Sequence, residues 1–184
     1  MLKAASGCNP LSHNPRMGTT ARPASVMPSG SQLLSLESLA RQQGTGLDAT
    51  DLVGCWMLHQ VWSKGNAAAN GLSSALLRSL GARLVLAPSE VDGHLLIGNA
   101  INLGALQLRF SGQGRLIGKR PLLQFSFDSL MLSIGGQTLL QQSLPPVSAR
   151  RLPFFALICR DDAGWLAARG RGGGLALWQL EPPS

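Results

Sequence analysis

Residues 105–134 read ALQLRFSGQGRLIGKRPLLQFSFDSLMLSI, and this stretch decides the fold class of the chain. Within 105–110 every second residue is apolar, and within 124–128 Phe125 and Phe127 alternate with polar residues. A period of two residues is typical of strands that bury one face and solvate the other, as in antiparallel sheets. The stretch therefore predicts an all-β protein.

Short apolar runs continue on both sides of this stretch. Turn dipeptides such as Ser111-Gly112 and Gly135-Gly136, and the triplet 162–164, separate them. Eight to ten short strands at close spacing indicate a closed antiparallel β-barrel or a sandwich. The short runs are Arg83–Leu86, His94–Gly98, Ala105–Phe110, Arg115–Gly118, Leu122–Phe127, Leu130–Ile134, Thr138–Gln142, Pro153–Cys159, Gly164–Ala168 and Leu175–Leu180. A longer strand, Leu52–Trp62, is expected before them.

A short helix is predicted before the strands. Ser31–Gln43 places leucines and an alanine on one face at helical spacing, and Gly44 follows it as a stop signal. Residues 46–50 form a connector, and residues 66–80 a helical or irregular excursion. The first 36 residues contain no Asp or Glu, which fits a plastid transit peptide, a disordered extension or a start codon assigned too early. We therefore divide the chain into an extension, 1–30, and a β-domain, 31–184.

The chain has few charges, and they are predominantly basic. Among its 184 residues, 16 are Lys or Arg and 9 are Asp or Glu, a net charge of +7. Such an excess suits an anionic membrane surface or nucleic acid, and an ordinary soluble face with extra arginines is equally compatible with it. In the β-domain the excess gathers between residues 106 and 151, in Arg109, Arg115, Lys119, Arg120, Arg150 and Arg151 against Asp128.

No stretch of the sequence predicts catalysis or a metal site. The three cysteines lack the paired spacing of zinc ligands, and the three histidines are scattered. The only adjacent carboxylates, Asp161-Asp162, point to opposite faces of a strand unless a turn intervenes. The glycine-rich 170–174 lacks the residues of a phosphate loop and predicts a turn between strands. We therefore expect no cofactor, no membrane-spanning helix and no secretory signal.

Two stretches together resemble the plastid lipid-associated protein (PAP/fibrillin) family. Gly54-Cys-Trp56 is similar to the Gly-x-Trp signature that opens the first strand of lipocalin-like barrels. Residues 161–177, with an acidic pair, Arg169-Gly170, a glycine turn and an apolar strand, resemble the family's closing motif. Segments 99–112 and 121–128 fit its middle strands, so the resemblance covers about residues 32–180. One departure is that Leu166 stands where the family has a first arginine, with Trp165 as its neighbour.

The resemblance implies a lipocalin-like barrel with an apolar interior and a role with lipids. It also implies that Gly54 and Trp56 close one end of the barrel, with the Arg169 guanidinium packed over the Trp56 ring. The opposite end is then left for a ligand. The candidate interior residues are Trp56, Leu108, Phe110, Phe125, Phe127 and Phe155, although large apolar residues are buried by default and can equally be core.

The function predicted from these observations is non-enzymatic binding of lipids or other small hydrophobic molecules, such as carotenoids or quinones. The protein is expected at the periphery of thylakoid membranes or lipid globules, in plastids or cyanobacteria, with the basic residues facing anionic headgroups. A basic nucleic-acid-binding module is the alternative, although the arginines are not interleaved with exposed aromatic residues. An enzyme on a barrel scaffold is a third possibility, in which His59 or His94 would face inward. The sequence leaves the oligomeric state open.

Overall fold

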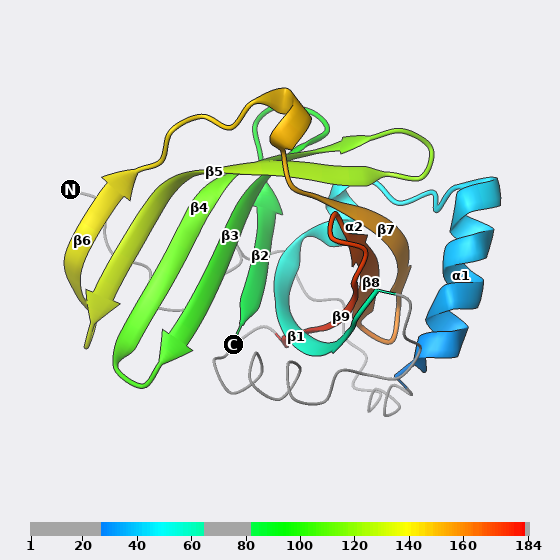
Figure 1. Ribbon diagram of the computed structural model, residues 1–184, viewed down its shortest axis with the longest axis horizontal. Helices are drawn as coiled ribbons and strands as arrows, with labels where there is room; N and C mark the ends of the chain where they lie inside the picture. The colour runs from blue at the N-terminus through cyan, green and yellow to red at the C-terminus, as the bar shows by residue number, and fades with distance from the viewer. Residues whose placement is uncertain (1–26, 65–81, 183–184) are drawn as a thin grey trace, which may run out of the picture.

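The computed structural model describes residues 27–64 and 82–182 of the chain. These residues form nine strands, two α-helices and one 3-10 turn (Figure 1). The expected excursion at 66–80 and most of the extension 1–30 lie outside the described residues. The elements are α1 Gly30–Gln43, α2 Ala49–Leu52, β1 Gly54–Trp62, β2 Arg83–Pro88, β3 His94–Leu103, β4 Leu106–Ile117, β5 Leu122–Ile134, β6 Gln137–Ser143, η1 Ala149–Arg151, β7 Phe154–Asp161, β8 Trp165–Gly170 and β9 Leu175–Leu180.

The described strands belong to one antiparallel sheet that closes on itself. Its order is β4-β3-β2-β1-β9-β8-β7-β5-β6, and β4 also pairs with β5. The ring therefore contains all the strands except β6, which lies outside it against β5. The ring closes through a short ladder, Leu122–Gln124 on β5 with Phe154–Ala156 on β7. The prediction of an antiparallel β-protein is confirmed.

The β4–β5 hairpin is longer than the sequence pattern predicts. Four expected strands merge into two, because β4 runs through Ser111-Gly112, where we expected a turn. The register shifts between these two residues, so the site is a β-bulge. A Cβ on Gly112 would lie 1.9 Å from the Ser126 carbonyl oxygen, so glycine is needed for the close approach of β5 and not for a turn. The predicted turn at Gly135-Gly136 is confirmed, between β5 and β6.

Helix α1 forms as predicted and covers the outer side of β7–β9. Ser29 caps its N-terminus in a reciprocal arrangement with Gln32, and Gly44 ends it with φ = 81°. Its buried Leu33 packs against Ile158 and Trp165 of the sheet. A second, four-residue helix, α2, replaces the end of the expected connector 46–50, because Asp48 caps it through its carboxylate.

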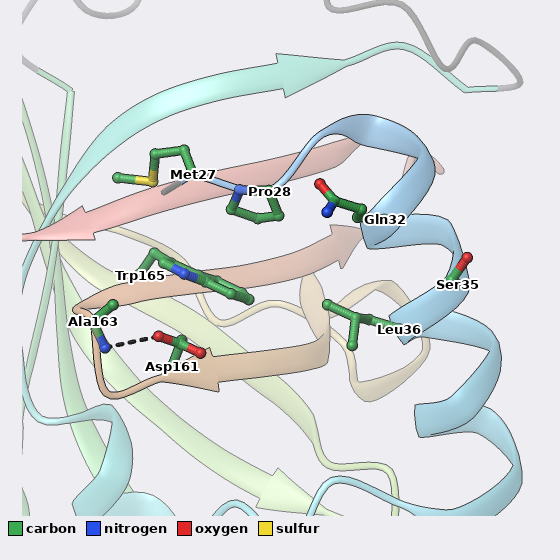
Figure 2. Close-up of a pocket in the computed structure, with 8 residues that line it drawn as sticks. All are labelled: Met27, Pro28, Gln32, Ser35, Leu36, Asp161, Ala163 and Trp165. Atoms are coloured by element: carbon green, nitrogen blue, oxygen red, sulfur yellow. Dashed lines mark hydrogen bonds between the residues drawn. The ribbon is translucent and has the colours of Figure 1, made fainter. Parts of the chain in front are cut away.

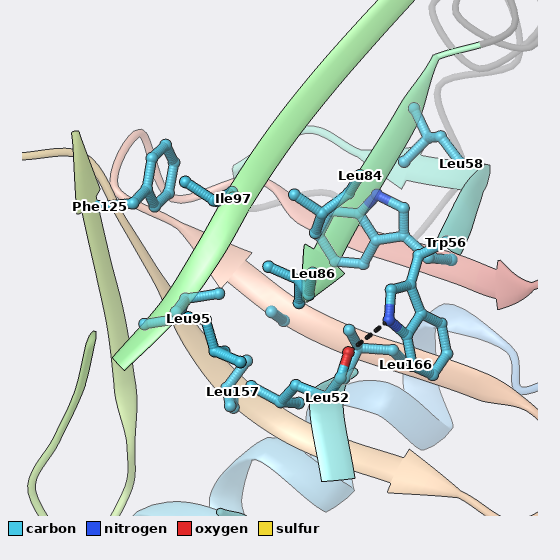
Figure 3. Packing of buried hydrophobic residues seen from close by; sticks show 13 residues of the cluster. Leu52, Trp56, Leu58, Leu84, Leu86, Leu95, Ile97, Phe125, Leu157 and Leu166 are labelled. Carbon is cyan, nitrogen blue, oxygen red and sulfur yellow. Dashed lines mark hydrogen bonds between the residues drawn. The ribbon is translucent and has the colours of Figure 1, made fainter. Parts of the chain in front are cut away.

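The main core lies inside the ring, where leucines from β1, β2, β3, β7 and β8 meet around Trp56 (Figure 3). Trp56 is completely buried, and its indole nitrogen donates to the Leu52 carbonyl at 2.8 Å. Gly54 precedes it with φ = 151°, and a Cβ there would lie 2.5 Å from the Leu180 side chain. Glycine at position 54 therefore has a steric reason in this chain.

Candidate binding site along an aromatic row

Five aromatic side chains form a continuous row that starts in the core of the strand ring and runs outward. They come from β4, β5, β7 and β9, strands far apart in the sequence. Each ring lies 5.2–5.5 Å from the next between centroids, the spacing of interacting aromatic pairs. In order, the aromatic row is Trp178, Phe155, Phe125, Phe127 and Phe110.

The outer end of the aromatic row is less buried than its members in the core. Trp178 and Phe125 are 6% and 9% exposed, whereas Phe127 and Phe110, and also Phe155 between the first two, are half-buried. The row therefore begins in the core and ends where the sheet extends beyond the strand ring. Phe110 pairs with Leu130 at that point, one residue beyond the β-bulge.

Beyond Phe110, β3, β4, β5 and β6 continue as a sheet extension with one apolar face. Residues directly opposite each other on antiparallel strands share a face. One row across the four strands is Ile101, Leu108, Leu132 and Leu140, and the next consists of Leu103, Leu106, Ile134 and Gln137. The opposite face carries Asn102, Gln107, Ser133 and Thr138. The apolar face continues the aromatic row, and its outer members are exposed, Leu103 by 55% and Leu140 by 46%.

Five of the six residues predicted for the interior lie along this path. Phe110, Phe125, Phe127 and Phe155 belong to the aromatic row, and Leu108 lies on the apolar face that continues it. Trp56 instead sits in the core. Trp178 was missed, although it alternates with Leu177 and Gln179 in an apolar final strand and its position on the inner face follows from that alternation.

Two hollows of the molecule lie on the outer side of the strands. One, of about 520 Å³, separates the start of α1 from the β7–β8 turn, with Met27, Leu36 and Trp165 in its wall (Figure 2). The Asp161 carboxylate in it accepts a hydrogen bond from the Ala163 amide at 2.7 Å. The other, about 580 Å³, is a groove along β2–β5 between Arg83 and Arg109.

Arg169 does not pack on Trp56. Leu166 and Ala168 point into the core with Trp56, whereas Trp165 and Ala167 face α1. Arg169 follows the second set, and its guanidinium donates to both oxygens of Glu37 on α1 and to the Gly173 carbonyl. The predicted pairing is therefore wrong, because the two side chains belong to opposite faces of the sheet.

Glu37 is the centre of a cluster of ion pairs on the outer side of the ring. The Glu37 side chain is only 4% exposed. Besides Arg169, the guanidinium groups of Arg41 and Arg120 form ion pairs with Glu37 Oε1, at N–O distances of 2.8 Å and 2.9 Å. Burial alone would raise the pKa of this carboxyl group, but the hydrogen bonds from Arg169, Arg41 and Arg120 outweigh burial and lower its pKa to about 2. The cluster fastens α1 to the sheet.

The Glu37 cluster could be predicted only in part from the sequence. Glu37 lies on the same face of α1 as the buried Leu33 and Ala40. A helical-wheel projection of α1 therefore places a carboxylate at a buried position. A buried carboxylate needs a cation. Which arginines supply it depends on the strand pairing, because Arg120 and Arg169 are 83 and 132 residues away.

The basic residues predicted as one membrane-facing patch lie at three places in the fold. Arg109 and Arg115 project from β4, and Lys119 and Arg120 lie in the β4–β5 turn. Arg120 is engaged by Glu37. Arg150 and Arg151 form η1, where Arg171 joins them by donating to the carbonyls of Arg150 and Leu152, both at 2.8 Å. We call Arg150, Arg151 and Arg171 the basic corner.

The described residues hold no group of three His, Cys, Asp or Glu that could bind a metal ion. The buried Cys55 thiol donates a hydrogen bond to Glu181, and burial raises the pKa of the Cys159 thiol. The predicted glycine turn at 170–174 connects β8 and β9. Within 27–64 and 82–182, no helix is both long and apolar enough to cross a membrane.

Comparison with models of known protein families, with curated proteins and with solved structures finds no match for this chain.

Proposed function

We propose that the protein binds a small hydrophobic molecule, such as a lipid, carotenoid or quinone, without catalysing a reaction. The strand ring is then a lipocalin-like barrel of the kind that the resemblance to the PAP/fibrillin family implies. The observation that carries the proposal is the aromatic row, which leaves the core at Phe125 and continues through half-buried Phe127 and Phe110.

The shape of this path suits an elongated apolar ligand. Aromatic faces pack on acyl chains and on polyenes, and soluble proteins rarely leave a wide apolar face exposed without a binding role. Most polar side chains of the sheet extension lie on its other face, in rows such as Gln107 and Ser133, whereas Gln137 and Gln142 lie at the β6 edge of the apolar face. A ligand on the apolar face would therefore meet few groups that need hydrogen bonds.

We place the protein at the periphery of photosynthetic membranes or lipid globules. The basic corner supports this location, because Arg150, Arg151 and Arg171 form no ion pair among the described residues. Each basic group near an anionic bilayer contributes about 1 kcal/mol of binding. Vesicles of phosphatidylcholine with phosphatidylglycerol should bind the protein more tightly than phosphatidylcholine vesicles, and replacing Arg150 and Arg151 by alanine should reduce that difference.

The ligand-binding proposal is tested with a fluorescent polyene fatty acid in solution, without vesicles. We expect saturable binding to the full chain, and displacement of the probe by carotenoid or quinone. Phe127→Ala should weaken probe binding at least about tenfold, since it removes a ring from the middle of the row. Phe154→Ala is the matched control, because Phe154 precedes Phe155 on β7 and points to the other face of the sheet.

Organic extraction of the purified protein followed by mass spectrometry identifies a ligand that is retained. Absence of saturable probe binding, together with repeated absence of an extracted apolar molecule, would refute the proposal. Equal weakening by Phe127→Ala and Phe154→Ala would mean that the row is only core.

A further inference from the structure

Strand β6 forms a free edge of the sheet. Gln137–Ser143 pairs with β5 on one side, and no described strand pairs with its other side. Every residue of β6 is exposed. Figure 1 shows it at the end of the sheet farthest from α1. Half of its backbone N–H and C=O groups therefore point outward along an edge that pairs with no strand of the described residues.

This edge carries none of the usual charged protection. Natural edge strands avoid pairing through lysines, prolines, inward charges or bulges. Residues 129–149 contain no charged side chain, and 137–143 contains no proline. The single bulge, where the register shifts opposite Leu132 and Ser133, lies near the turn and leaves Leu140–Ser143 regularly paired.

The chemistry of the edge selects its partner. A bilayer supplies no hydrogen-bond groups in its hydrocarbon region, so open sheet edges are not tolerated there. A second strand satisfies both the N–H and the C=O groups. Because β6 is uncharged, a copy of itself meets no electrostatic repulsion. We propose that β6 pairs antiparallel with β6 of a second copy of this chain and makes a two-fold symmetric dimer.

The geometry of this pairing extends the apolar face. Two antiparallel edges are related by a two-fold axis normal to the sheet, which keeps each face on the same side. An axis at Gln141 places Gln141 opposite the partner's Gln141 and Leu140 opposite the partner's Gln142. The row of Ile101, Leu108, Leu132 and Leu140 then continues across the partner's Gln142 to the partner's Leu130, because Gln142 pairs with Leu130 within each copy. This inference goes beyond ligand binding and does not depend on it.

Sedimentation velocity over a concentration series of about 5 to 500 µM tests the proposal, because an interface this small is expected to be weak. The wild-type chain should shift from monomer to dimer. Gln141→Lys should weaken self-association at least about tenfold at low salt, and so should Gln141→Glu, because each places like charges opposite one another. An equimolar mixture of the two should recover the dimer. Gln113→Lys is the control, since Gln113 is an exposed residue on a strand paired on both sides.

A wild-type chain that stays monomeric throughout the series overturns the proposal. So does a dimer that Gln141→Lys leaves intact, or two variants whose mixture stays monomeric. Loss of phosphatidylcholine–phosphatidylglycerol vesicle binding in Gln141→Lys, with a wild-type monomer, would assign the edge to a membrane instead. Titrating the polyene probe into Gln141→Lys tests the proposed function separately. Probe binding that matches the wild type would show that ligand binding stands even where the dimer proposal fails.

Discussion

The Glu37 cluster makes the stability of the protein depend on one carboxylate. Glu37→Gln keeps the shape of the side chain and removes its charge. Arg169 and Arg120, each only about a fifth exposed, then lose their anionic partner. Removing one member of a buried ion pair is costly because the remaining charge stays desolvated. We therefore expect a lower free energy of unfolding at neutral pH.

The size of the loss follows from the shift of the Glu37 pKa. The pKa is about 2 in the folded protein against 4.5 ordinarily, and one pKa unit corresponds to about 1.4 kcal/mol. That difference sets an upper limit of about 3 kcal/mol. Arg41 is 59% exposed, and solvent screens its contribution, so we expect about 2 kcal/mol.

The same shift predicts the pH dependence. A carboxyl group with a lowered folded pKa contributes its full stability above its unfolded pKa, about 4.5, and loses it as the pH falls toward 2. The difference between wild type and Glu37→Gln should therefore be constant from pH 6 to 7 and shrink steadily below about pH 4.5. Both proteins should approach the same stability near pH 2.

Urea unfolding followed by tryptophan fluorescence measures both quantities. Trp165 packs in the cluster under α1 and reports on that region. Glu90→Gln is the control, because Glu90 is exposed and has no ion pair among the described residues. A loss below about 0.5 kcal/mol at pH 7, or the same loss at pH 3 as at pH 7, would refute the reasoning.

Three further substitutions test the local structure by the same urea unfolding. Gly54→Ala should cost about 1–3 kcal/mol, because alanine is strained at φ = 151° and its Cβ would meet Leu180; a neutral effect would contradict the steric reason for glycine at position 54. Gly112→Ala should cost at least about 3 kcal/mol, since the Ser126 carbonyl is backbone and cannot rotate away; a well-folded variant with unchanged polyene binding would show that the bulge adapts. Ser29→Ala should cost about 1 kcal/mol by removing the cap of α1, and Ser29→Gly less.

The sequence predicts the antiparallel sheet and α1 because both rest on local periodicity. Alternation in 105–110 and 124–128 requires a sheet with a buried face, and the stripe from Leu33 to Ala40 requires a helix against it. The lengths of β4 and β5 were not predictable in the same way. Gly112 reads as a turn residue from its neighbours, and only the approach of the Ser126 carbonyl shows that it belongs to a strand.

The sequence predicts most of the residues of the candidate site but not how they are arranged in space. Phe125 and Phe127 are two residues apart, so their shared face follows from strand geometry. Phe155 and Trp178 reach the same row only because β7 and β9 lie on the same side of the ring. The basic residues between 106 and 151 separate for the corresponding reason, since β4, the β4–β5 turn and η1 lie at different places in the sheet.

The two halves of the sheet differ in how they are covered, and this difference bears on function. Around β7–β9 the outer face is covered by α1, and the Glu37 cluster fixes the helix there. The inner face of the same strands is filled by the core around Trp56. Beyond Phe110 the apolar face of the extension has exposed members, including Leu103 and Leu140. Burial of apolar surface stabilises a protein by about 25 cal/mol per Å², so an uncovered apolar face gives up folding stability and favours association instead. The ring half therefore holds the buried end of the aromatic row, and in both proposals the extension is the part where a ligand or a second copy would gain the most by binding.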